Sequence, residues 1–348
     1  MTRTKVKVPA TVSRRRVAAE TPEVNYFACG TDKDLEFVST GCALFDAVLG
    51  GGYVLGRIAN IVGDKSTGKT LLAIEACANF ANAYADGYIR YAEAEAAFDE
   101  RYAEALGMPV ARVDFADNIF TIEDLFEDLE RTIEQQAKRP CIYIVDSLDA
   151  LSDRAEQKRA IDDGSYGMTK QKKLGELFRR LVQKLEASRI LLIVISQIRD
   201  KIGVTFGETK TRSGGKSLDF YASHVVWLSE VEKMKRTIEK VERITGVRVR
   251  ARCKKNKIGL PFRECEFPVL FGYGVDDLTA AAEWIIDVGK EDMLTAIGLS
   301  KAGYKIRINN IRGKGGTDVA ELRQQLKEVV VREWRAIETK FLPPSRKY

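Results

Sequence analysis

Residues 63–70 have the spacing of a phosphate-binding loop. Their sequence, GDKSTGKT, matches the pattern GxxxxGK[ST] at Gly63, Gly68, Lys69 and Thr70. Glycines allow successive backbone N–H groups to face a phosphate, and the N-terminus of a following helix adds a favourable dipole. We therefore expect a bound nucleoside triphosphate, with Lys69 beside its β- and γ-phosphates and Thr70 as a ligand of Mg²⁺. The expected nucleotide site also contains Asp64, Lys65, Ser66 and Thr67.

Acidic residues follow two other apolar segments. Asp146 comes directly after the run CIYIV, where an ionised carboxylate is costly to bury without a partner. We expect Asp146 to lie beside the magnesium ion, the alternative being a residue that caps the next turn. Glu93 and Glu95 alternate off the end of segment 88–92, so both side chains point the same way. Either could orient the water that attacks the triphosphate or form a surface salt bridge, and their spacing does not distinguish them.

The segments that must position these residues alternate between apolar strands and amphipathic helices, which predicts an α/β layer architecture. Strands are expected at 58–62, 88–92, 141–146, 190–196 and 225–229. The first four are apolar enough to be buried on both faces of a mostly parallel sheet. Two later segments, 247–253 and 265–271, predict shorter antiparallel strands. After Asp277 the pattern is helical, and Asp318 with Glu321 predicts a capped helix N-terminus.

The composition is that of an ordinary soluble protein, with 45% hydrophobic and 30% charged residues in a chain of 348. The longest apolar run, 190–195, is too short to span a bilayer, and the N-terminus lacks a secretory signal. The cysteines have no CxxC spacing, so we expect a reducing, cytoplasmic location. The single histidine, His224, makes a multi-histidine metal site improbable and is expected to be a strand residue. Basic blocks at 1–16 and 301–314 contain no acid, which favours a polyanionic partner.

Several segments together resemble the bacterial RecA recombinase family. They are STGCALFDAVLGGG, GDKSTGKT, AEAEAAFDERYAEALG, YIVDSLDAL, ISQIRDKIGVTFG, SGGKSLDFYAS and KKNKIGLPFRECEFPVLFGYG. The resemblance implies an ATP- and Mg²⁺-dependent recombinase that forms a helical filament on single-stranded DNA and catalyses homologous pairing and strand exchange. It also implies a RecA-type P-loop ATPase core at 37–277, with a mostly parallel central sheet flanked by helices. A basic oligomerisation arm at 1–36 and a small α+β C-terminal domain at 278–348, for duplex DNA, complete the expected organisation.

The same resemblance assigns roles around the nucleotide. The family's catalytic glutamate falls on Glu95, and Glu93 stands where an aspartate is usual. Tyr102 matches the aromatic residue that stacks on adenine, and Asp99 matches a carboxylate that faces the base. Gln197 matches the glutamine that senses the γ-phosphate and passes that state to the following loop.

Two lysines imply an assembly. Lys255 and Lys257 match lysines that reach the phosphates held by the neighbouring protomer, so the resemblance implies a homo-oligomer with ATP at its interfaces. At one such interface, Asp219 stands where a lysine is usual. Two other functions remain open at this point: a ring-forming DNA motor with the same core, and a recombination mediator that binds ATP without catalysing exchange.

Two segments match the family's DNA-binding loops. The second loop, 199–216, contains the expected contacts Arg199, Lys201, Arg212, Gly214, Gly215 and Lys216. Bare glycine backbone can approach a phosphate closely, and Ile202 matches an apolar wedge between base triplets.

The first loop, 154–170, departs from the family by about one extra residue, so the wedge opposing Ile202 is either Tyr166 or Met168. The helix after it supplies Lys172 and Arg179. The chain lacks the acidic tail that restrains many members from duplex DNA, so ready binding of both single-stranded and double-stranded DNA is expected. Single-strand-binding and loader proteins are the expected protein partners.

Overall fold

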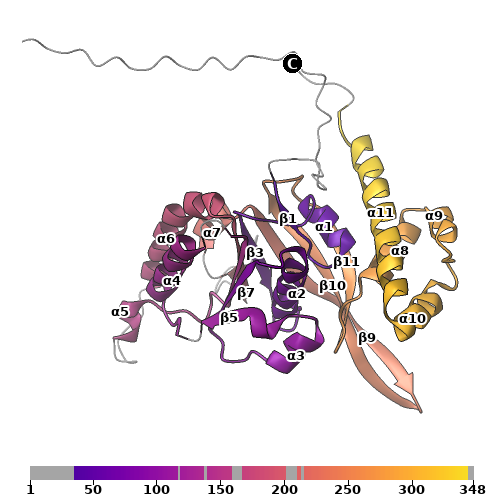
Figure 1. Cartoon of the computed structure of the whole chain (residues 1–348), viewed down its shortest axis with the longest axis horizontal. Helices are drawn as coiled ribbons and strands as arrows, with labels where there is room; N and C mark the ends of the chain where they lie inside the picture. Colours follow the sequence, from indigo (N-terminus) through magenta and orange to yellow (C-terminus); the bar gives the residue numbers. More distant parts are fainter. Residues whose placement is uncertain are drawn as a thin grey trace, which may run out of the picture.

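The computed structural model describes residues 35–116, 118–136, 139–158, 167–200, 210–212 and 215–343. A ten-stranded sheet runs through this part of the chain, with helices on both of its faces (Figure 1). Its strand order is β12-β11-β10-β9-β3-β7-β6-β4-β5, and β8 pairs with β7. None of the described helices combines the length and apolar character needed to cross a bilayer.

The centre of the sheet is parallel and one side is antiparallel. The parallel strands are β3 (Ile58–Gly63), β4 (Tyr88–Glu93), β5 (Val113–Ala116), β6 (Cys141–Asp146), β7 (Ile190–Asp200) and β9 (His224–Ile238). The antiparallel strands are β8 (Lys210–Arg212), β10 (Val241–Asn256), β11 (Glu264–Leu270) and β12 (Gly274–Val275). A separate two-stranded ribbon joins β1 (Phe37–Val38) to β2 (Tyr53–Val54).

Alternate residues of the central strands feed two cores, one on each face of the sheet. In β6, Ile142 and Ile144 belong to one cluster, whereas Cys141, Tyr143 and Val145 belong to the other. The first cluster contains α1 (Ala43–Leu49), α2 (Lys69–Ala83), α3 (Glu100–Ala105) and the C-terminal helices; the second contains α4 (Ile122–Gln135), α6 (Gly167–Ala187) and α7 (Gly215–Tyr221). Burial on both faces explains why these strands are continuous apolar runs in the sequence, and the expected α/β core is confirmed.

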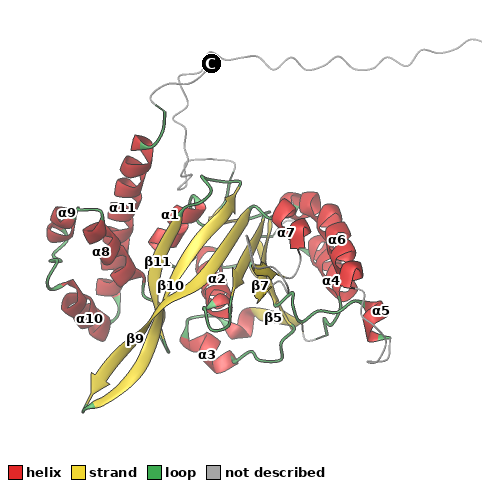
Figure 2. Cartoon of the chain, turned by 180° about the vertical axis from the view of Figure 1, so that it is seen from behind, coloured by secondary structure: helices red, strands yellow, loops and turns green. Residues whose placement is uncertain are grey.

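Strands β9 and β10 are longer than expected, whereas β11 has the predicted length. The predicted segments 225–229 and 247–253 are parts of a hairpin in which β9 and β10 extend beyond the rest of the sheet, as Figure 2 shows. Cross-strand pairing continues to the turn, where Ile238 lies opposite Val241. The outer half of this hairpin covers no core and carries charged residues on both faces, so it lacks the hydrophobic alternation that predicts a strand.

The C-terminal region is helical, and the expected α+β composition of this region is wrong. Residues 276–343 contain no strand; their helices are α8 (Asp277–Asp287), α9 (Glu291–Ala296), α10 (Tyr304–Lys314) and α11 (Thr317–Lys340). Leu322, Leu326 and Val330 form a helical stripe on α11 that joins the first core cluster. The predicted cap is also wrong, because α11 begins after Gly316 without a side-chain cap and Asp318 lies in its first turn.

His224 is the first residue of β9, as expected of a strand residue. Its side chain is fully buried, and its Nε2 donates to the carbonyl oxygen of Leu49 at 2.9 Å. Burial lowers the pKa of this imidazole to about 4, so it is neutral at physiological pH.

Candidate nucleotide and DNA site

The phosphate-binding loop connects β3 to α2, as its motif predicts. Gly63 ends the strand, and a Cβ atom there would lie 2.4 Å from Thr67 Oγ1, so only glycine fits. Gly68 precedes the helix with φ of 84°, a left-handed conformation that favours glycine. Lys69 Nζ donates to the carbonyl oxygen of Asp64 at 2.7 Å. The loop therefore places a lysine and a helix N-terminus together at the carboxyl end of β3, where anions bind.

The loop meets the end of β6 through Thr70 and Asp146. Thr70 Oγ1 donates to Asp146 Oδ2 at 2.8 Å, and the hydroxyl of Tyr91 donates to the same oxygen at 2.9 Å. Burial raises the pKa of Asp146 to about 6; the two hydroxyl donors oppose this shift, and the charges of Glu95 and Glu93 add to it. Sequence reasoning missed Tyr91, although its position two residues before Glu93 puts it on the same side of β4.

The structure distinguishes the two glutamates that follow β4. The carboxylate of Glu93 accepts the backbone N–H groups of Glu95, Ala96 and Ala97 at 3.0, 2.9 and 3.2 Å. It thus holds a tight loop in which Ala96 has a φ of 53°. Glu95 instead points its Oε1 at Gln197, whose Nε2 donates to it at 2.8 Å, and Ser147 Oγ also donates to this oxygen.

Gln197 lies on β7, opposite Gly63 of the phosphate-binding loop strand. Its backbone N–H donates to Asp149 Oδ2 at 2.7 Å, in the turn that follows β6. Four parallel strands, β3, β4, β6 and β7, therefore bring Lys69, Thr70, Asp146, Glu95 and Gln197 to one edge of the sheet. Burial lowers the pKa of Lys69, and the negative charges of Asp146 and Glu95 oppose the shift. Ser147 and Asp149 were missed, because only the folded turn brings them to Glu95 and Gln197.

The two residues expected at adenine lie on α3, the helix that follows the Glu95 loop. Asp99 caps this helix, its Oδ1 accepting the backbone N–H of Tyr102 at 3.1 Å. The Tyr102 side chain is half-buried against the first core cluster, and burial raises its pKa.

Lys255 and Lys257 lie at the opposite edge of the sheet from the phosphate-binding loop. Lys255 pairs with Val225 at the start of β9, whereas Gly63 pairs with Leu228 further along the same strand. Lys255 Nζ donates to the carbonyl oxygens of Phe220, at 2.7 Å, and Asp219; Lys257 Nζ donates to that of Phe220 at 3.2 Å. Three residues of a strand span about 10 Å, and two strand spacings add about 10 Å sideways. The structure therefore does not bring these lysines into the nucleotide site of their own chain.

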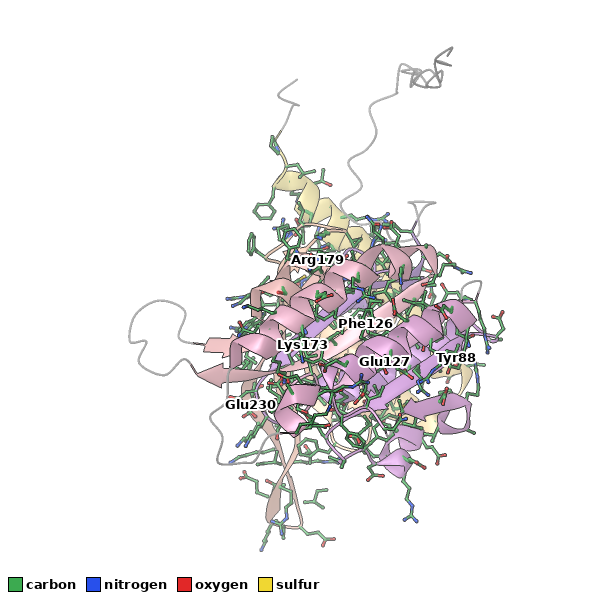
Figure 3. All side chains as sticks on the ribbon, turned by 90° about the vertical axis from the view of Figure 1, so that its left-hand side faces the viewer. Tyr88, Phe126, Glu127, Lys173, Arg179 and Glu230 are labelled. Carbon is green, nitrogen blue, oxygen red and sulfur yellow. The ribbon has the colours of Figure 1, made fainter. Side chains whose placement is uncertain are left out.

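Of the residues expected at DNA, Lys172 and Arg179 are exposed on α6. Figure 3 shows Arg179 on the face of the molecule formed by α6 and α4. Arg199 lies in β7, Arg212 in β8, and Gly215 and Lys216 in α7. Lys201, Ile202, Gly214 and Tyr166 lie outside the described residues, and Met168 lies in the first turn of α6.

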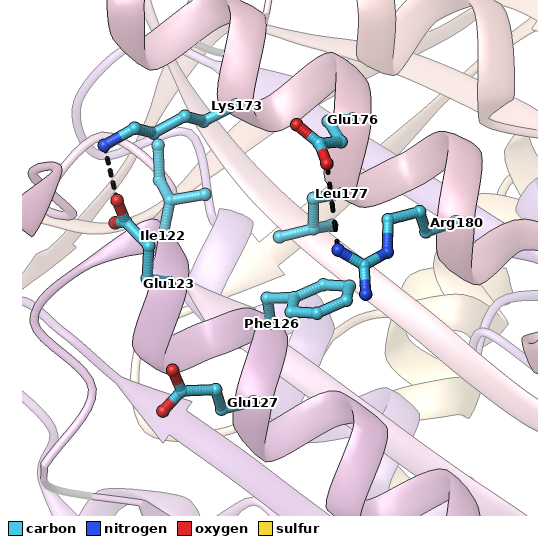
Figure 4. A pocket seen from close by; sticks show the side chains of 8 residues that line it. All are labelled: Ile122, Glu123, Phe126, Glu127, Lys173, Glu176, Leu177 and Arg180. Atoms are coloured by element: carbon cyan, nitrogen blue, oxygen red, sulfur yellow. Dashed lines mark hydrogen bonds and ion pairs between the residues drawn. The ribbon is translucent and has the colours of Figure 1, made fainter.

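Two hollows adjoin these elements. A cavity of about 460 Å³ borders the phosphate-binding loop; its lining includes Lys65, Trp227, Arg250, Arg252 and Lys254. Lys254 Nζ lies 3.8 Å from the centroid of the Trp227 ring. A second cavity, of about 260 Å³, lies between α4 and α6 (Figure 4), and its lining includes no residue of the phosphate-binding loop. Within this cavity the guanidinium carbon (Cζ) of Arg180 lies over the Phe126 ring, 4.2 Å from its centroid.

Comparisons with known proteins agree with this geometry. The family model described as the RecA N-terminal domain matches residues 24–276. A protein named Protein RecA from a Synechocystis species is 34% identical over 248 residues, covering 70% of this chain and 67% of that relative. Those of Streptomyces venezuelae and Trichormus variabilis are each 33% identical, covering 75% and 80% of this chain. The matched region spans 66% of the Streptomyces protein and 73% of the Trichormus protein.

Proposed function

Since the chain belongs to the RecA family, we propose that it is an ATP-dependent DNA recombinase. It forms a helical filament on single-stranded DNA and catalyses homologous pairing and strand exchange in DNA recombination and repair. The observation that carries this proposal is the link between two pairs of residues at one sheet edge. Thr70 with Asp146 suits a nucleotide-bound magnesium ion, and Glu95 with Gln197 connects that site to segment 199–216, expected at DNA.

The residues at the carboxyl edge of the sheet fit ATP and Mg²⁺. Gly63 leaves room for the Thr67 side chain inside the loop, Gly68 adopts the left-handed conformation that precedes the helix, and Lys69 supplies a positive charge. Thr70 and Asp146 would hold Mg²⁺, which neutralises charge on the phosphate oxygens when it is bound. Glu95 is the exposed carboxylate with the geometry of a general base, since Ser147 and Gln197 both contact one of its oxygens and hold its orientation.

Gln197 is the proposed switch between nucleotide and DNA. Its side chain contacts Glu95, and two residues later the chain enters the segment expected to bind DNA. A γ-phosphate that attracts the amide of Gln197 would take it from Glu95 and shift the start of that segment. DNA bound to the segment would favour the same shift, because coupling between two ligands is reciprocal.

Opposite-edge placement of Lys255 and Lys257 supports a head-to-tail assembly. Lysines that are too far from the nucleotide of their own chain can complete the site of a neighbour. An interface that joins two different surfaces of identical chains generates an open helix when its rotation does not close. The proposed arm at 1–36 would add to this interface, and the core at 37–277 would carry both the nucleotide and the single strand.

The helices after residue 277 are the proposed contact for duplex DNA. On α10, Arg307 and Lys314 are exposed, and the surrounding segment 301–314 contains no acid. Backbone contacts of this kind carry no base specificity, so base pairing would select the partner strand. We place the protein in the cytoplasm, with single-strand-binding and loader proteins as further partners.

The decisive test combines ATP hydrolysis with strand exchange. Purified protein with Mg²⁺, ATP and single-stranded DNA should hydrolyse ATP faster than without DNA and form joint molecules with homologous duplex. Glu95→Gln should keep nucleotide and DNA binding and lose about 100-fold or more of the hydrolysis rate, the contribution of a general base. Hydrolysis without joint molecules would contradict the recombinase, and closed rings on DNA in electron micrographs would favour a motor instead.

A further inference from the structure

Asp149 contacts the backbone where β7 leads into the segment expected at DNA. It lies in the turn 147–150 that directly follows β6. Hydrogen bonds join this turn to β7: the Leu148 N–H donates to the Ile195 carbonyl oxygen at 3.0 Å, and the Gln197 N–H donates to Asp149 Oδ2 at 2.7 Å. The pairing of β6 with β7 ends at Val145 and Val194, so the Asp149 carboxylate supplies an acceptor after β6 has turned away.

Gln197 is therefore held at two points. Asp149 holds its backbone, and Glu95 holds its side chain through the amide Nε2 at 2.8 Å. Ser147, in the same turn as Asp149, donates to the same oxygen of Glu95. One turn thus contacts both the proposed general base and the proposed switch residue. A backbone N–H without a partner in a half-buried strand is costly. The contact with Asp149 therefore favours one position of the Gln197 backbone.

We propose that Asp149 is a positioning residue, which fixes the backbone of Gln197 so that movement of its side chain is passed on to the segment at 199–216. This inference rests on the proposed function, because it assigns Asp149 a part in the coupling of ATP to DNA. The role requires a hydrogen-bond acceptor at position 149 and not a negative charge. An asparagine, which keeps a side-chain oxygen of the same reach, should therefore substitute for it.

Two variants of the full chain, Asp149→Ala and Asp149→Asn, test whether position 149 needs a hydrogen-bond acceptor or a negative charge. The exposed Asp292→Ala of α9 serves as a control. Hydrogen exchange of the Gln197 amide, measured by mass spectrometry without nucleotide or DNA, should be about tenfold faster in D149A. It should be unchanged within about a factor of two in D149N and in D292A. Thermal melting of all three variants establishes that each one is folded.

The second measurement is the concentration of single-stranded DNA that gives half-maximal ATP hydrolysis. D149A should raise this concentration about tenfold with less than a twofold change in the KM for ATP, and D149N should restore it. Unchanged exchange in D149A overturns the proposal, as does faster exchange with an unaltered DNA dependence, which would leave Asp149 a structural contact only. Equal rises in the KM for ATP in both variants would assign Asp149 an effect on the charge of Lys69 instead. If the unmodified chain hydrolyses no ATP, the proposed function fails, while the exchange measurement still tests the contact itself.

Discussion

The single histidine gives this protein a pH dependence of stability that can be assigned to one side chain. His224 is fully buried at the start of β9, and the structure lowers its pKa from the ordinary 6.5 to about 4. The unfolded chain therefore binds a proton near pH 6.5, whereas the folded chain resists it until about pH 4. This side chain stabilises the fold fully above pH 6.5, and that contribution is lost as the pH falls from 6.5 to 4.

The size of the effect follows from the difference between the two pKa values. A difference of about 2.5 units corresponds to roughly 3 kcal/mol when the titration is complete. Between pH 7.5 and pH 5, about 2 kcal/mol of the free energy of unfolding should disappear for this reason. Buried carboxyl groups such as Glu75, with a pKa of about 7, change the stability in the opposite direction over this range, so the total curve does not isolate His224.

The substitution His224→Gln isolates the contribution of this histidine to the pH dependence of stability. A glutamine has an N–H that can donate to the Leu49 carbonyl oxygen and does not titrate. Urea unfolding of both proteins at several pH values should show their stability difference shifting by about 2 kcal/mol in favour of the variant between pH 7.5 and pH 5. With labelled histidine, NMR gives one imidazole signal from the folded protein, which should titrate well below pH 6. A midpoint near 6.5 in the folded protein would refute the buried neutral imidazole and the stability argument built on it.

Three further experiments test the assembly and the packing. The variants Lys255→Ala and Glu95→Gln should each be inactive alone. An equimolar mixture should recover roughly a quarter of the DNA-dependent ATPase rate, because about one interface in four joins an intact Glu95 to an intact Lys255. A mixture as inactive as its components would argue against sites shared between chains. Tyr143→Phe removes the hydroxyl that donates to the buried Asp128 at 2.7 Å, so urea unfolding should show a loss of about 1–3 kcal/mol. A neutral result would mean that Arg90 and Arg131, which also donate to this carboxylate, satisfy Asp128 without the hydroxyl. Leu326→Ala, at 1% exposure on α11, should cost about 2–5 kcal/mol in the same assay, and a loss well under 1 kcal/mol would contradict the shared core.

That Lys69, Thr70 and Asp146 lie together could be predicted because their signals are local. A glycine-rich loop between an apolar run and a helix fixes Lys69 and Thr70, and an acid after a second apolar run points to Asp146. Parallel strands then bring these residues to one edge without any further information. The different contacts of Glu93 and Glu95 cannot be predicted from the neighbouring residues in the sequence. It depends on a loop that bends back on Glu93 through the left-handed Ala96, and alternation along a strand carries no signal for that turn.

Other features depend on distant parts of the chain. Asp149 acquires its contact with Gln197 only because β7 lies beside the turn after β6. The two residues are 48 positions apart in the sequence. The outer hairpin of β9 and β10 is held by cross-strand pairing and not by burial, so no hydrophobic pattern marks it. In the C-terminal region the helical stripe of α11 was visible, but the expected strands came from the family resemblance and not from the residues themselves.

The separation of Lys255 and Lys257 from the phosphate-binding loop has a consequence for growth. In a head-to-tail chain of copies, every junction joins the lysine edge of one copy to the loop edge of the next. A filament of n copies then has n − 1 complete sites, and its two ends differ: one presents an unfilled loop and the other presents unused lysines. Nucleotide bound at the exposed loop would prepare that end to receive another copy. The end with unused lysines has no exposed phosphate-binding loop, so it presents no nucleotide to an incoming copy. Such a polymer has a direction built into each subunit, and it could add and lose subunits at unequal rates at its two ends.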